Sequence, residues 1–129
     1  MELLIVIAII GLLAATAMFA LSNVQARARD AKRVADIDQL VKALDLYINQ
    51  TGNSYPVVLS AICLDGSDIV NTEIKAAGIS AQGFQDPFYD TSPNCFRYIS
   101  DADGTSYSVQ FYLETGSVSK KGFNTISVE

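Results

Sequence analysis

The chain has 129 residues, a net charge of −5 and no histidine or tryptophan. Without histidine it lacks the commonest general base and the commonest metal ligand, which weighs against an enzyme. No catalytic residue and no resident cofactor are therefore expected. The first fifth of the chain is apolar, so the remainder can form only one small domain with a modest core.

Charge is unevenly distributed along the sequence. Residues 27–50 hold five basic and four acidic side chains, a balance of +1, whereas residues 51–129 hold four basic and nine acidic ones, a balance of −5. An acidic outer part is poorly suited to nonspecific contact with a nucleic acid backbone, so no specific nucleic acid partner is predicted. This balance still allows a local basic patch.

The stretch Leu3–Ala26 contains no charged side chain over 24 residues. As a helix it would be roughly 36 Å long, enough to cross a hydrocarbon core of about 30 Å. A cleaved secretory signal has a shorter apolar segment behind a basic start, but here Glu2 precedes the stretch. A basic cluster follows it, with Arg27, Arg29, Lys32 and Arg33. By the positive-inside rule this cluster favours a cytoplasmic location for that end, whereas the expected disulfide of the downstream domain points outward.

Glu2 is the distinctive polar residue of this stretch. A carboxylate costs up to about 3 kcal/mol when it is drawn into the apolar layer, so such a group usually has a partner or a role. On composition alone, an acid resting at the membrane surface explains Glu2 equally well.

Residues 2–15, with the sequence ELLIVIAIIGLLAA, closely resemble the N-terminal signature of bacterial type IV pilins and type II secretion pseudopilins. In that family a prepilin peptidase removes a short basic leader, and the mature chain begins Phe-Thr-Leu-x-Glu. Met1 then occupies position x, and three residues would precede it. The resemblance covers about the first 30 residues.

The resemblance implies a structural subunit of a type IV pilus-like surface filament. Such a subunit resides in the bacterial inner membrane, is extracted by pilus assembly platform proteins, and joins a helical homo-oligomer at the cell surface. A type II secretion pseudopilin is the nearest alternative, and a single-pass membrane-anchored binding domain is a further one. Adhesion, twitching, DNA uptake and secretion stay open, because similar subunits serve all four.

The resemblance also implies roles in assembly for Glu2 and Gly11. Glu2 would neutralise the N-terminal amine of a neighbouring subunit, and a charge pair in a dry core requires both members. Many pilins have a proline eight residues after the signature glycine, where this chain has Phe19. We therefore expect the helix to continue, although Gly11 weakens it by about 1 kcal/mol relative to alanine.

Beyond residue 26 the helix becomes amphipathic. Apolar residues recur at helical spacing up to Gln50, and Gly52 and Pro56 mark the end. We therefore divide the chain into residues 1–26 (membrane or filament-core helix), 27–50 (amphipathic half of the same helix) and 51–129 (head). The predicted stripe that faces the head comprises Val24, Ala28, Ala31, Val34, Ala35, Ile37, Val41, Leu44 and Ile48.

The head is predicted to contain a short helix near Asp68–Ala77 and three antiparallel strands, Phe96–Ser100, Ser106–Leu113 and Phe123–Val128. Asp103-Gly104 and Thr115-Gly116 supply turns. Together with the long helix these strands form the α+β arrangement of the pilin fold. A loop with the sequence Asp86-Pro87-Phe88-Tyr89 weakly resembles a loop of the secretion pseudopilins.

Cys63 and Cys95 are the two cysteines, and in an exported chain we expect them to form a disulfide. Closing a loop of about 30 residues contributes roughly 3–4 kcal/mol in the chain-entropy model. Asp101 and Asp103 resemble the start of a calcium loop, and some pseudopilins bind calcium in this domain. The pattern is incomplete, and we favour a hairpin turn over a metal site.

Overall fold

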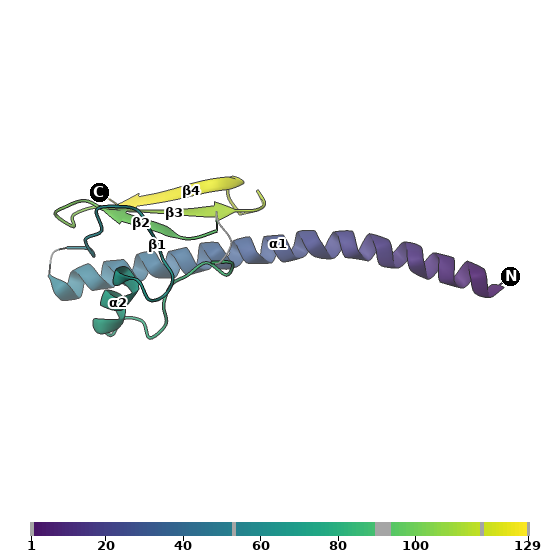
Figure 1. Ribbon diagram of the computed structural model, residues 1–129, viewed down its shortest axis with the longest axis horizontal. Helices are drawn as coiled ribbons and strands as arrows, with labels where there is room; N and C mark the ends of the chain where they lie inside the picture. Colours follow the sequence, from purple (N-terminus) through teal and green to yellow (C-terminus); the bar gives the residue numbers. More distant parts are fainter. Residues whose placement is uncertain (1, 53, 90–93, 117, 129) are drawn as a thin grey trace.

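The computed structural model of the chain describes residues 2–52, 54–89, 94–116 and 118–128, with the side chain of residue 19 left out. Helix α1 (Glu2–Thr51) extends from one end of the molecule to the other, and the head packs against its C-terminal half (Figure 1). The 50 residues of α1 correspond to about 75 Å. The α+β prediction is confirmed.

Helix α1 continues without a break through Gly11 and position 19, as the absence of proline predicted. It curves gently over its N-terminal half (Figure 1). The helix ends where Gly52 adopts a φ of 87°, and the Gly52 N–H donates to the Ile48 carbonyl oxygen at 3.1 Å. Such a left-handed residue commonly follows the end of a helix. The last helical residue, Thr51, is one residue beyond the predicted end at Gln50.

The head contains a four-stranded antiparallel sheet of order β1-β2-β3-β4. Strands β2 (Arg97–Ser100), β3 (Tyr107–Leu113) and β4 (Gly122–Val128) correspond to the three predicted strands. The fourth strand, β1 (Ile62–Cys63), was not predicted, because two residues are too few to show a period. Helix α2 (Ile69–Ala76) begins at Asp68, whose side chain accepts a hydrogen bond from the Asn71 N–H.

The core lies between the sheet and α1. Along β3, alternate side chains are buried from Tyr107 to Leu113, as the period-two pattern predicted. They pack against α1, where Ile37, Leu40 and Leu44 are 0–1 % exposed. The fold thus attaches the head to one half of α1 only.

The predicted apolar stripe is wrong in its N-terminal part. Val24, Ala28, Ala31 and Ala35 are exposed in the single chain. When the buried positions 37, 40 and 44 are continued toward the N-terminus by helical periodicity, they reach residues 33 and 30. Those positions hold Arg33 and Asp30, both 0 % exposed. Charged side chains occupy this part of the interface because partners from the head satisfy them.

Candidate assembly stalk and the ionic cluster at its base

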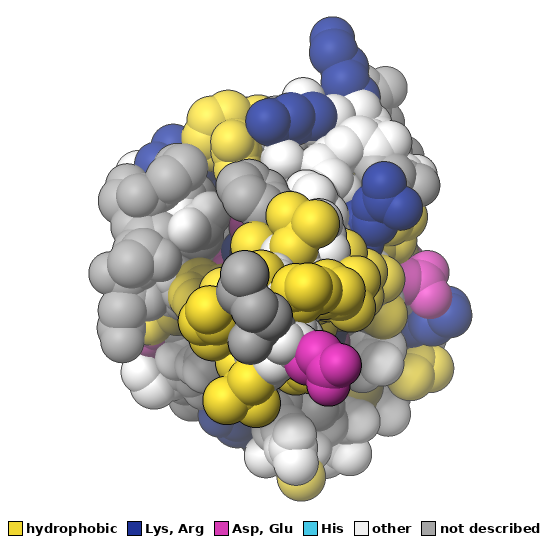
Figure 2. Space-filling view, turned by 90° about the vertical axis from the view of Figure 1, so that its right-hand side faces the viewer, with side chains coloured by type: hydrophobic (Ala, Val, Ile, Leu, Met, Phe, Trp, Pro, Cys, Tyr) yellow, Lys and Arg dark blue, Asp and Glu magenta, His cyan; other side chains and the backbone are white. Residues whose placement is uncertain are grey.

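The N-terminal half of α1 stands free of the head, and we call residues 2–26 the stalk. Its most apolar 18-residue window has a mean hydropathy of 2.8 and is 0 % buried, so by length and composition this helix can cross a membrane. Figure 2, viewed from this end, shows hydrophobic side chains around the helix. Burying one leucine or isoleucine gains about 2 kcal/mol, so a surface of this size requires lipid or protein to cover it.

The two predicted assembly residues both lie on this exposed stalk. Glu2 is in the first turn of α1, and the nearest basic side chain along the helix is Arg27, about 38 Å away. A partner for Glu2 among the described lysines and arginines is therefore out of reach. At Gly11 an added Cβ would meet nothing within 4 Å, so the fold of the single chain places no demand on a glycine there.

Where the head begins, charged side chains from three separate segments meet, and we call this group the ionic cluster. It contains residues of α1, of the loop before β2, and of the segment that follows β3: Arg29, Asp30, Arg33, Asp86 and Glu114. Arg33, Asp30 and Asp86 are at most 1 % exposed. Removing charges from water is costly, so such a group persists only when its members are paired.

Arg33 is the centre of the ionic cluster. Its Nε donates to Asp86 Oδ2 at 2.7 Å and its Nη2 to Asp86 Oδ1 at 3.3 Å, which makes a forked contact. Its Nη1 donates to Glu114 Oε1 at 2.7 Å and to Asp30 Oδ1 at 3.1 Å. The planar guanidinium matches two oxygens of a carboxylate, a geometry that lysine cannot reproduce.

Asp30 links α1 to the segment after β3. Its carboxylate accepts hydrogen bonds from the Glu114 N–H at 2.9 Å and from the Thr115 N–H and hydroxyl, both at 2.7 Å. Arg29 completes the connection with Nε and Nη2 at 2.9 and 2.5 Å from the two Glu114 carboxylate oxygens. The Arg29 guanidinium also lies 5.1 Å from the centre of the Phe88 ring.

Pairing outweighs burial in setting the protonation of these groups. Hydrogen bonds from Arg29 and Arg33 lower the pKa of Glu114 to about 2. Burial alone would raise the pKa of Asp30, but hydrogen bonds from Thr115, the Glu114 backbone and Arg33 lower it below the ordinary value. Burial opposes the charge of Arg33, and its bonds to Asp86 and Glu114 raise its pKa nonetheless. Glu114, Asp30 and Arg33 are therefore ionised near neutral pH.

Sequence reasoning missed the ionic cluster, although one signal was present. Asp30 and Arg33 fall on the same helical face as Ile37, Leu40 and Leu44, so a charged pair occupies an otherwise apolar stripe. The partners Asp86 and Glu114 are 53 and 81 residues from Arg33 in the sequence. Nothing local in the sequence connects them.

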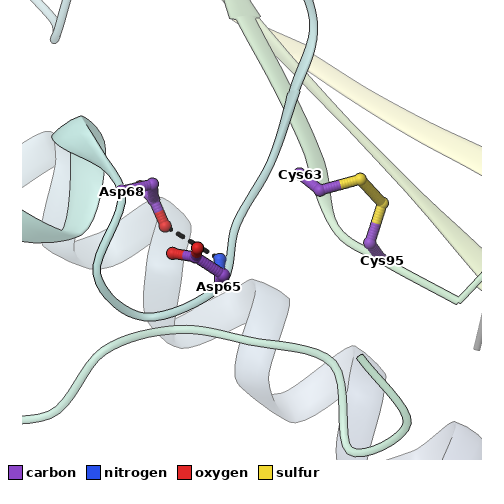
Figure 3. The surroundings of a disulfide bond; sticks show 4 residues. All are labelled: Cys63, Asp65, Asp68 and Cys95. Atoms are coloured by element: carbon purple, nitrogen blue, oxygen red, sulfur yellow. Dashed lines mark hydrogen bonds between the residues drawn. A yellow bond between two sulfur atoms is a disulfide. The ribbon is translucent and has the colours of Figure 1, made fainter. Parts of the chain in front are cut away.

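The predicted disulfide between Cys63 and Cys95 is present, with Cα atoms 5.5 Å apart (Figure 3). It joins β1 to the segment that enters β2. In the turn after β1, the Asp65 N–H donates to Asp68 Oδ2 at 2.9 Å, so the bridged strand leads directly into the cap of α2 (Figure 3). The disulfide therefore fixes the start of the sheet to the connecting region.

Asp101 and Asp103 lie in the hairpin between β2 and β3, and the predicted turn is confirmed. The Asp101 carboxylate accepts from the Thr105 N–H at 2.8 Å, the Thr105 hydroxyl at 2.6 Å and the Ser106 N–H at 3.2 Å. These hydrogen bonds lower the pKa of Asp101. Within the described ranges, no group of three or more His, Cys, Asp or Glu side chains is placed to hold a metal ion. Calcium binding at Asp101 and Asp103 stays a prediction.

Comparisons with protein-family models, with curated proteins and with solved structures found no match. The stalk, the head and the N-terminal resemblance are therefore the features that bear on function.

Proposed function

We propose that this chain is the structural subunit of a type IV pilus-like surface filament and polymerises through its stalk. The observation that carries the proposal is the exposed apolar stalk on a head that packs against the other half of the same helix. Lipid would cover the stalk in the inner membrane, and the stalks of neighbouring copies would cover it in the filament. No catalytic role is proposed.

Glu2 supplies the register in this proposal. An unpaired carboxylate inside a bundle of apolar helices is costly, and pairing with the N-terminal amine of an adjacent subunit removes that cost. A subunit that docks one step out of register would leave both charges unpaired. The partners that follow from the resemblance are a prepilin peptidase, pilus assembly platform proteins and further copies of this chain.

Replacement of Glu2 by Gln in the producing organism tests this function. We expect sheared cell fractions to lose filaments under electron microscopy, while the protein remains in the inner-membrane fraction. Asp38→Asn is the matched control, because Asp38 is an exposed acid whose salt bridge to Lys42 lies on the surface of α1. Filaments as abundant with E2Q as with the native chain would overturn the proposal. A native protein that stays monomeric in the bilayer would favour the single-pass anchored domain.

A type II secretion pseudopilin is the second candidate. The loop that weakly resembles one in pseudopilins is held tightly to α1, because its Asp86 is buried and forked to Arg33. A calcium titration of the full chain in detergent, with the melting temperature as the readout, distinguishes the two functions. A rise that Asp101→Asn and Asp103→Asn abolish would favour the pseudopilin, whereas long surface filaments would favour the pilin.

A further inference from the structure

Exposed cations gather where the stalk leaves the head. Arg27 lies one helical turn before Asp30, and Lys120 and Lys121 directly precede β4; all three are exposed. We call these three residues the basic collar. The salt bridges among the described residues do not include them. Figure 2, viewed along the stalk, shows Lys and Arg side chains projecting on this face around the apolar helix.

The basic collar contrasts with the rest of the chain. Its three cations lie at the stalk side of the head, whereas the chain as a whole carries a net charge of −5. Among the described residues, two carboxylates of the adjoining ionic cluster are not available to neutralise it. Asp30 is buried, and Glu114 is already bound by Arg29 and Arg33.

The ionic cluster fixes the height of the collar along the stalk. Asp30 binds the backbone at Glu114 and Thr115, which holds the start of the segment leading to Lys120 and Lys121 beside residue 30 of α1. Residue 30 is about 6 Å beyond Ala26 along the axis, and a bilayer with its headgroups is roughly 40–45 Å thick. A stalk that fills the hydrocarbon core therefore places the collar at the level of the lipid phosphates.

We propose that the basic collar binds the headgroups of anionic phospholipids and holds the head against the bilayer before assembly. The proposal rests on the membrane-inserted stage of the proposed function. Each cation near an anionic surface shifts the equilibrium between the undocked and the docked head about fivefold at low salt. The two lysines together therefore shift it roughly 30-fold toward the docked head. Added salt shortens the screening length from about 10 Å at 0.1 M to about 3 Å at 1 M and releases the head.

The test uses the full chain in lipid nanodiscs made with and without phosphatidylglycerol, each with a trace of lipid that carries a nitroxide on its headgroup. Paramagnetic broadening of backbone amides reports how close each amide lies to the headgroups. We expect the amides of Ser119 and Gly122 to broaden more strongly in the anionic disc, and high salt to reverse the effect. Lys120→Gln with Lys121→Gln removes the extra broadening. The control, Lys42→Gln with Lys75→Gln, makes the same change in net charge on other parts of the surface and keeps it.

If the chain inserts in both discs but its amides broaden equally in the anionic and the neutral disc, the collar proposal is overturned. Broadening or association that depends on protein concentration in neutral discs would also overturn it, and would indicate a second copy as the partner. A chain that does not insert in either disc would instead contradict the proposed function.

Discussion

Replacing Arg33 by Met should destabilise the head severely, because it removes the centre of the ionic cluster while leaving the carboxylates of Asp30 and Asp86 buried. Among the described residues, Asp86, at 1 % exposure, would keep only the side-chain hydrogen bond from the Phe88 N–H at 2.7 Å. Asp30 would keep its bonds to Glu114 and Thr115. The Asp86 carboxylate would therefore lose both hydrogen bonds from the Arg33 guanidinium without gaining access to water.

Breaking a buried ion pair from one side costs about 3–5 kcal/mol, and much of that is the remaining charge rather than the lost contact. For a domain of this size, 1 kcal/mol corresponds to about 4–8 °C, so R33M should lower the melting temperature by at least about 12 °C. Asp86→Leu should be similarly harmful, since it leaves Arg33 short of a partner. The double variant R33M/D86L should be less destabilised than the sum of the two single variants by about 1–3 kcal/mol.

Guanidinium unfolding of the full chain in a nonionic detergent, followed by near-ultraviolet circular dichroism, measures these costs. The signal comes from the head, where the Tyr98 and Tyr107 rings stack with centroids 5.7 Å apart. Lys42→Met is the matched control, because its pair with Asp38 is 70 % and 62 % exposed and should contribute only about 0.5 kcal/mol. A cost below about 1 kcal/mol for R33M, or strictly additive costs in the cycle, would refute the reasoning.

Acid should weaken the head through Glu114, whose pKa of about 2 lies below the ordinary 4.5. The ionised Glu114 contributes about 2–3 kcal/mol to the free energy of unfolding. This contribution is complete above about pH 5 and is lost as the pH falls toward 2. Urea unfolding over this range should show the loss, and Glu114→Gln should flatten it. Removing the disulfide with Cys63→Ala and Cys95→Ala should cost roughly 3–4 kcal/mol by the same assay, and an unchanged unfolding midpoint would contradict the entropic account. At Gly104, φ is 65° and an added Cβ would lie 2.7 Å from a neighbouring side chain, so Gly104→Ala should cost more than Gly78→Ala, where φ is 70° and the space is open. Equal melting temperatures for the two glycine variants would show that the crowding is relieved.

Much of the fold follows from local rules in the sequence. The absence of proline before residue 52 predicted one continuous helix, and Gly52 predicted its end. The alternation from Tyr107 to Leu113 identified the central strand, its neighbours followed from the turn residues, and Cys63 and Cys95 predicted the bridge. Each of these signals acts within a few residues or, for the cysteines, through a unique pairing.

The ionic cluster could not be predicted in the same way. The sequence predicts Arg33 as one of four cations flanking a membrane segment, because Arg27, Arg29 and Lys32 precede it. Its burial depends on Asp86 and Glu114, which are distant in the sequence and meet Arg33 only in the folded chain. A helical face that alternates apolar and charged residues is ambiguous until its partners are known.

The position of the ionic cluster suggests how force on a subunit would be carried. The head contacts α1 through an apolar core centred on Ile37, Leu40 and Leu44, and such contacts resist separation but are non-directional. The forked bonds from Arg33 and the bonds to Asp30 require one alignment of α1 with the head. They lie at the end of the interface nearest the stalk, where a pull along the stalk first meets the head. In the proposed extraction from the membrane, sliding of α1 past the sheet would have to break these buried charge pairs as well as the apolar contacts.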